Sequence, residues 1–213
     1  MPKLIIFDVD GVLLDNKLGG FKELLIELGK EKEVKEIADE YQKRKNQGPW
    51  GLEELANLFA GSGINQIKSL AHEYCEKKLM YGAKETIAEL EKRKIILGAI
   101  SSNPQILLDE LKTILSLDFV EGTRLNEQGG FLGGEIERKV DRFIKAEILQ
   151  EKIKELNLSK EDVVVVGDSL TDVPMSKLAG KFIVFNCSDE KIKQAGNVVV
   201  DKKDLREILY AIS

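Results

Sequence analysis

Two aspartates near the start of the chain are placed to share one pocket. Asp8 and Asp10 follow the apolar run from Leu4 to Phe7, with one valine between them. On an extended segment, side chains two positions apart point to the same side, so both carboxylates can face one site. Such a pair could bind a cation or take part in catalysis. Taken alone, it is explained equally well by a turn at the end of a strand, because short acidic motifs are common.

A second pair of aspartates follows another apolar run. Asp168 and Asp172 lie in Gly-Asp-Ser-Leu-Thr-Asp, directly after the run from Val163 to Val166. An unpaired carboxylate behind a buried strand is unfavourable without a cation, so Asp168 indicates a metal site. Asp172 stands two positions before Pro174 and could cap a helix, a role that is compatible with metal support. Carboxylates around Mg²⁺ suit phosphoryl transfer, because the metal offsets repulsion between an anionic nucleophile and an anionic substrate.

Phosphoryl transfer also requires hydroxyl and basic partners. Ser101 ends a further apolar run, where its hydroxyl could donate to a phosphoryl oxygen with help from the backbone amides of Ser102 and Asn103. An ordinary helix cap would account for Ser101 as well. Either Lys145 or Lys139 could supply positive charge next to a nucleophile, although most lysines in so lysine-rich a chain face solvent.

The segments that carry these residues alternate between strand and helix patterns. Continuous apolar runs bounded by polar or glycine residues are typical of strands buried on both faces of a sheet. Strands are expected at 4–7, 95–100, 163–166, 182–185 and 197–200, and helices over 83–92, 142–156 and 204–212. This alternation predicts an α/β fold with a doubly wound parallel sheet, in which ligands bind at the carboxyl ends of the strands.

Two segments interrupt the alternation. From about residue 21 to residue 80, apolar residues recur at helical spacing without a strand pattern, which predicts an inserted α-helical cap subdomain. We expect a core of residues 1–16 and 82–213 and a cap of residues 17–81. Between 119 and 137, paired glycines separate short apolar stretches, which favours a β-hairpin or an irregular excursion.

Composition narrows the classes of partner. The 213 residues suffice for one α/β domain with a modest insertion, and a net charge of -5 with a pI near 5.2 gives no attraction to nucleic acid. The apolar run behind Met1 is too short for a signal peptide or a membrane span, so we expect a cytoplasmic protein without membrane contact. Cys75 and Cys187 lack metal or disulfide spacing and are expected to be buried. The expected partner is a small molecule.

In chain order, an acid pair, a serine, a lysine and Gly-Asp-x-x-x-Asp resemble the four motifs of the haloacid dehalogenase (HAD) superfamily, whose core is a Rossmann-like sheet. The stretches that begin at Lys145, Val163 and Lys203 are most similar to phosphoserine phosphatase-like members. This similarity selects Lys145 over Lys139 as the lysine of the third motif.

The resemblance implies a role for each candidate. Asp8 would attack phosphorus, and Asp10 would protonate the leaving oxygen and later activate water. The phosphate would be bound by Ser101, Ser102, Asn103 and Lys145, and Mg²⁺ by Asp8, the main-chain carbonyl of Asp10, Asp168 and Asp172, the last directly or through water. An acid at Asp10 argues against the dehalogenase branch, since a leaving alkoxide needs a proton and a halide does not.

Some positions depart from the phosphoserine phosphatase pattern. The second motif reads Ser-Ser-Asn-Pro from Ser101 where those enzymes usually have Ser-Gly-Gly, and Lys17 stands in place of an acid that binds the substrate amine. Because Lys17 would repel an ammonium group, phosphoserine is not singled out, and sugar phosphates, phosphoglycolate or another small acid phosphate suit the site as well. Trp50 could line the substrate pocket, although packing within the cap also explains it.

The predicted function is Mg²⁺-dependent hydrolysis of a small phosphomonoester metabolite through an aspartyl-phosphate. Two alternatives remain open at this point. A phosphomutase or phosphotransferase of the same fold would pass the phosphoryl group to a second hydroxyl, and a non-catalytic phosphate-binding protein would keep the fold without turnover. Access of water to the pocket separates hydrolysis from transfer.

Overall fold

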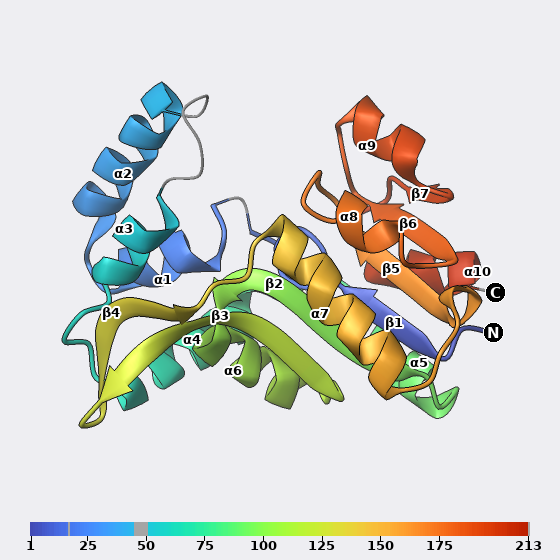
Figure 1. Cartoon of the computed structure of the whole chain (residues 1–213), viewed down its shortest axis with the longest axis horizontal. Helices are drawn as coiled ribbons and strands as arrows, with labels where there is room; N and C mark the ends of the chain where they lie inside the picture. Colours follow the sequence, from blue (N-terminus) through green and yellow to red (C-terminus); the bar gives the residue numbers. More distant parts are fainter. Residues whose placement is uncertain (17, 45–50, 213) are drawn as a thin grey trace.

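The computed structural model describes residues 1–16, 18–44 and 51–212 and is built around a seven-stranded sheet (Figure 1). The strands are β1 (Leu4–Phe7), β2 (Ile96–Pro104), β3 (Phe119–Gln128), β4 (Phe131–Arg138), β5 (Val163–Gly167), β6 (Lys181–Phe185) and β7 (Val198–Val200). Their order is β4-β3-β2-β1-β5-β6-β7, and all neighbours are parallel except β3 and β4. This mostly parallel sheet confirms the predicted α/β, doubly wound fold.

The helices expected over 83–92 and 142–156 are present, and the structure adds helices at 105–115 and 190–195 that the sequence pattern did not predict. The helices of the structure are α1 (Gly20–Glu27), α2 (Glu31–Arg44), α3 (Leu52–Asn57), α4 (Ile64–Lys78), α5 (Ala83–Lys92), α6 (Gln105–Leu115), α7 (Arg142–Glu155), α8 (Val173–Ser176), α9 (Glu190–Ala195) and α10 (Ile208–Ile212). The helix expected over 204–212 is divided, because Asp204 caps a 3-10 turn, Leu205–Glu207, before α10 begins. No helix in the described part of the chain is long and apolar enough to cross a bilayer.

Both faces of the sheet are covered by helices, which explains why β1 is apolar at every position. Leu4 and Ile6 belong to the hydrophobic cluster beneath α7, α8 and α9, whereas Ile5 and Phe7 belong to the cluster beneath α5, α6 and α10 (Figure 1). β1 lies in the middle of the sheet between β2 and β5. Residues that follow β1 are therefore flanked by the carboxyl ends of β2 and β5.

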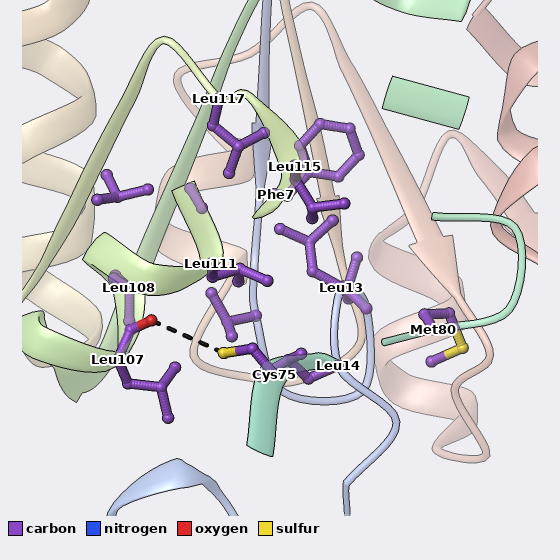
Figure 2. Close-up of a cluster of buried hydrophobic side chains, with 14 of the residues drawn as sticks. Phe7, Leu13, Leu14, Cys75, Met80, Leu107, Leu108, Leu111, Leu115 and Leu117 are labelled. Atoms are coloured by element: carbon purple, nitrogen blue, oxygen red, sulfur yellow. Dashed lines mark hydrogen bonds between the residues drawn. The ribbon is translucent and has the colours of Figure 1, made fainter. Parts of the chain in front are cut away.

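The segment between β1 and α5 forms α1 to α4, as its helical pattern predicts. α4 packs against α6, and Figure 2 shows Cys75 of α4 beside Leu107 of α6. The thiol of Cys75 donates a hydrogen bond to the carbonyl oxygen of Leu107 (3.8 Å). Cys75 and Cys187 are buried and unpaired, as expected. The inserted helices thus share a hydrophobic cluster with the sheet.

The chain enters and leaves this insertion side by side. The backbone N–H of Asp15 donates to the carbonyl of Lys78 (2.6 Å), and that of Met80 donates to the carbonyl of Leu13 (2.9 Å). Leu14 lies opposite the residue before Met80 in an antiparallel bridge. The two crossing segments therefore form a short antiparallel ladder at the base of the insertion.

The hairpin predicted between 119 and 137 is present as β3 and β4. Its tip reaches the segment between α3 and α4, where Leu132 accepts a backbone hydrogen bond from Gly61 (2.8 Å) and donates one to Ser62 (2.9 Å). The N–H of Ile64 donates to the carbonyl of Gly130 (2.9 Å). The hairpin thus connects the edge of the sheet to the inserted helices.

Candidate active site

The ends of β1, β2 and β5 meet at one edge of the sheet and surround a pocket of about 270 Å³. It is lined by Asp8, Asp10, Gly11, Asn16, Leu18, Gly19, Ser101, Ser102, Lys145, Asp168, Ser169 and Thr171. Six of the eight candidates from the sequence are therefore brought together in the lining. The other two, Asn103 and Asp172, are buried and bonded to residues of the lining.

Asp8 directly follows β1 and is almost completely buried. Its backbone N–H donates to the carbonyl of Val166 in β5 (2.9 Å), which continues the strand pairing. Its Oδ1 accepts hydrogen bonds from Lys145 Nζ (2.9 Å) and from the backbone N–H of Val9 (2.8 Å). Burial and then the charge of Asp172 raise the pKa of Asp8 well above its ordinary value, whereas Lys145 lowers it. The charge of Asp8 thus depends on the cations beside it.

Lys145 is the cation that the structure places next to Asp8. Its Nζ, buried near the start of α7, donates to Asp8 Oδ1 (2.9 Å) and to Asp172 Oδ1 (3.0 Å). Burial on its own lowers the pKa of Lys145, but the two carboxylates outweigh burial and leave the pKa above its ordinary value. Lys139, the alternative from the sequence, is partly exposed and pairs with Glu53 (2.7 Å).

Asp172 organises the loop after β5. It stands at the N-cap position of α8, but its side chain makes no hydrogen bond to that helix, so the capping interpretation is wrong. Its Oδ2 instead accepts hydrogen bonds from the backbone N–H groups of Asp168 (3.2 Å) and Ser169 (3.1 Å). With Lys145 on Oδ1, both oxygens have donors. The side chain turns back to the strand end because Gly167 leaves room there: a Cβ at Gly167 would lie 2.6 Å from Asp172 Oδ2.

Three carboxylates form a cluster that suits a divalent cation. Asp8, Asp168 and Asp172 each present an oxygen, and these atoms lie within 4.8 Å of one another. Burial first and the charge of Asp172 second raise the pKa of Asp168 to about 7. Oxygen ligands with this excess of negative charge fit Mg²⁺. Gly11 borders the cluster with φ of +78°, and a Cβ there would fall 2.1 Å from Asp168 Oδ2, so glycine is required at this position.

Asp10 is held by two side-chain amides. Its Oδ1 accepts hydrogen bonds from Asn103 Nδ2 (2.9 Å) and from Asn16 Nδ2. Burial raises the pKa of Asp10, and the two amides act against burial. Asn16 was not among the candidates from the sequence. The available signal was its position in the loop that leaves β1, six residues after Asp10.

Ser101 lies inside β2 and is buried except where it lines the pocket. A helix cap is therefore not its role: Pro104 is the N-cap residue of α6, without a side-chain cap. The backbone N–H of Asn103, which was expected to assist at the phosphate, donates to Ser101 Oγ (3.3 Å). Lys17 and Trp50, both considered for the substrate end of the site, lie outside the described residues.

Comparisons with known proteins identify similar chains. A family model described as haloacid dehalogenase-like hydrolase matches residues 2–180. The phosphoserine phosphatase of Methanocaldococcus jannaschii is 33% identical over 211 residues, which cover 99% of this chain and 97% of that protein. A crystal structure of phosphoserine phosphatase in apo form aligns with a TM-score of 0.81 at 31% identity over 100% of both chains. A structure described as a phospho-aspartyl intermediate analogue of phosphoserine phosphatase has a TM-score of 0.80 at 31% identity, covering 100% of this chain and 99% of that one.

Proposed function

Since the chain belongs to the haloacid dehalogenase-like hydrolases, we propose that it is a Mg²⁺-dependent phosphatase that hydrolyses a small phosphomonoester through an aspartyl-phosphate on Asp8. The observation that carries the proposal is the bond between the buried carboxylate of Asp8 and the ammonium of Lys145, within a pocket that Asp10, Ser101 and Asp168 also line. A similar structure is described as a phospho-aspartyl intermediate analogue.

The reaction proceeds in two balanced displacements. In the first, a carboxylate oxygen of Asp8 bonds to phosphorus, the bond from phosphorus to the ester oxygen breaks, and that oxygen takes the proton of Asp10. In the second, a water molecule attacks phosphorus and gives a proton to Asp10, and the bond from phosphorus to Asp8 breaks. Inorganic phosphate leaves, and both aspartates return to their starting states. The Ser101 hydroxyl and Lys145 stabilise the negative charge on the transferring group.

Mg²⁺ would supply positive charge that offsets the negative charges of the nucleophile and of the phosphoryl oxygens. Asp8 and Asp168 would hold it together with the main-chain carbonyl of Asp10. Asp172 would support the site mainly by fixing Lys145 and the loop after β5, since both of its oxygens already accept hydrogen bonds.

The relatives and one position of the sequence support the proposed substrate class. The curated relative and the two solved structures reported above are described as phosphoserine phosphatases, which supports a small phosphorylated metabolite as substrate. Lys17, however, replaces the acid that the resemblance predicts for binding an amine. A small phosphomonoester without an ammonium group, such as phosphoglycolate or a sugar phosphate, therefore suits this chain better than phosphoserine.

The proposed function is tested by phosphate release from a panel of small esters. The panel contains phosphoserine, phosphoglycolate and several sugar phosphates, each assayed with Mg²⁺ and with a chelator, and with an added alcohol to detect phosphoryl transfer. We expect release that depends on Mg²⁺ and is slowest with phosphoserine. Release from no ester would contradict phosphatase activity. Transfer to the alcohol without release would indicate a phosphotransferase, and a preference for phosphoserine would contradict only the substrate class.

The raised pKa of Asp168 predicts how the stability of the metal-free protein depends on pH. The pKa of Asp168 rises from 3.8 to about 7 in the folded chain. Between these values the folded state binds more protons than the unfolded state, so stability is lost as pH rises. We expect the melting temperature of metal-free protein to fall, relative to that of Asp168→Asn, from about pH 4 to about pH 7. Saturating Mg²⁺ should remove this trend, because it replaces the proton. A constant difference between the two proteins across this range would refute the assignment.

A further inference from the structure

The two amides around Asp10 come from different parts of the chain and reach the same oxygen. Asn103 lies near the end of β2 and is 2% exposed, and Asn16 lies in the loop that leaves β1 and lines the pocket. Both donate through Nδ2 to Oδ1 of Asp10. Gly20 packs over the Asn103 amide, since a Cβ there would lie 3.0 Å from Asn103 Oδ1. The Asn103 amide is thus held in a fixed orientation.

This arrangement distinguishes the two oxygens of Asp10. Oδ1 receives two N–H donors and therefore acts as an acceptor. Oδ2 lies on the side of Gly19, which also lines the pocket: a Cβ at Gly19 would lie 3.1 Å from Oδ2. The backbone N–H of Gly20 also faces this carboxyl group. A neutral Asp10 that keeps both amide bonds on Oδ1 must carry its proton on Oδ2.

Asn16 is itself held by the inserted helices. Its Nδ2 also donates to the hydroxyl oxygen of Tyr74 in α4 (2.8 Å), so one amide group bonds both Asp10 and the insertion. Within the described residues, the Oδ1 of Asn16 is buried without a hydrogen-bond partner. A buried acceptor without a partner is unfavourable. Asn16 therefore contributes through its donor group, and that group points to Asp10.

We propose that Asn103 and Asn16 are positioning residues that fix Oδ1 of Asp10, so that Oδ2 presents its proton to the leaving oxygen of the ester. This inference rests on the proposed phosphatase function. Without the amides the Asp10 side chain rotates about its terminal bond, and the proton spends less time toward the ester. The loss of kcat/KM in variants without the amides should therefore be larger for an ester whose leaving group must be protonated. Asn103 stands where the Ser-Gly-Gly pattern has a glycine, which has no side chain that could bond Asp10.

The test compares two esters of similar size with different leaving groups. Benzyl phosphate releases an alkoxide that must be protonated, whereas 4-nitrophenyl phosphate releases a stable phenolate. The value of kcat/KM reports the steps up to departure of the alcohol, which is the step that uses the proton. We would measure it for Asn103→Ala, Asn16→Ala and the double variant, in saturating Mg²⁺. Asn126→Ala is the control, because the hydrogen bonds of the Asn126 side chain to other described residues are to Glu135 in the hairpin, away from Asp10.

For benzyl phosphate we expect kcat/KM to fall about tenfold in each single variant and further in the double variant. For 4-nitrophenyl phosphate it should stay within about twofold, and the control should leave both values unchanged. Equal losses with both esters, or no loss with either, would overturn the inference while the phosphatase function stands. If the wild-type protein hydrolyses neither this pair nor any ester of the panel, both the positioning inference and the proposed phosphatase function are contradicted. If Asn103→Ala does not fold, Asn16→Ala on the pocket side gives the same comparison.

Discussion

Replacement of Asp8 by asparagine should abolish phosphate release from every ester that the protein accepts. The amide lacks the anionic oxygen that attacks phosphorus, so the phosphorylated intermediate cannot form. We expect kcat to fall about 10⁴-fold or more, with no phosphate label retained on the chain after acid quench. Since asparagine has nearly the same shape as aspartate, the far-ultraviolet circular dichroism spectrum should not change.

Asp15→Asn is the matched control for this prediction. Asp15 lies seven residues after Asp8 but is exposed and forms its ion pair with Lys203. Removing its charge should leave turnover unchanged. If Asp8→Asn retained substantial activity while Asp15→Asn behaved as wild type, a nucleophile other than Asp8 would be required.

Replacement of Lys145 by methionine should impair both stability and turnover. The ammonium is buried between the carboxylates of Asp8 and Asp172, and methionine preserves its approximate length without its charge. Removing one partner of a buried ion pair leaves uncompensated charge, so we expect the unfolding free energy in a chelator to fall by about 3 kcal/mol or more. Loss of a donor to the transferring group should lower kcat by about 10²-fold to 10³-fold. Urea unfolding and steady-state kinetics measure the two effects.

Lys139→Met provides the comparison. Lys139 is the other lysine considered from the sequence, but it pairs with Glu53 at the surface, where ion pairs contribute about 0–1 kcal/mol. We expect nearly wild-type stability and kinetics. Mg²⁺ should restore part of the stability of Lys145→Met, because a dication also offsets the charges of Asp8 and Asp172. Equal behaviour of the two lysine variants would contradict the role of Lys145.

The sequence was sufficient to predict the features that follow from strand topology. Asp8 and Asp168 each come directly after an apolar run, and parallel strands bring such positions to one edge of a sheet. Their proximity therefore required no knowledge of side-chain contacts. The lysine was different: Lys139 and Lys145 were both possible until the resemblance to a family distinguished them. The structure shows the physical difference, since only Lys145 is carried by α7 into the pocket.

Contacts between distant side chains could not be predicted in this way. Asn103 and Asp10 are 93 positions apart, and Asn16 and Tyr74 are 58 apart. An isolated asparagine in a loop carries no pattern that names its partner. The strand expected at 95–100 is longer in the structure, because β2 continues through an irregular pairing with β3 between Ile100 and Pro104. Such irregularities accommodate proline in a strand but leave no periodic signal.

The short ladder at the base of the inserted helices has an evolutionary consequence. Because Asp15 and Lys78 are joined by a backbone hydrogen bond, the insertion begins and ends at the same place. The free-energy cost of closing a loop grows slowly, by roughly 0.6 kcal/mol for each doubling of the loop length. Residues between these two positions can be gained, lost or exchanged over generations without moving β1 or the aspartates that follow it. Descendants of one ancestral hydrolase could thus diversify through this segment while the chemistry at the sheet edge was inherited unchanged.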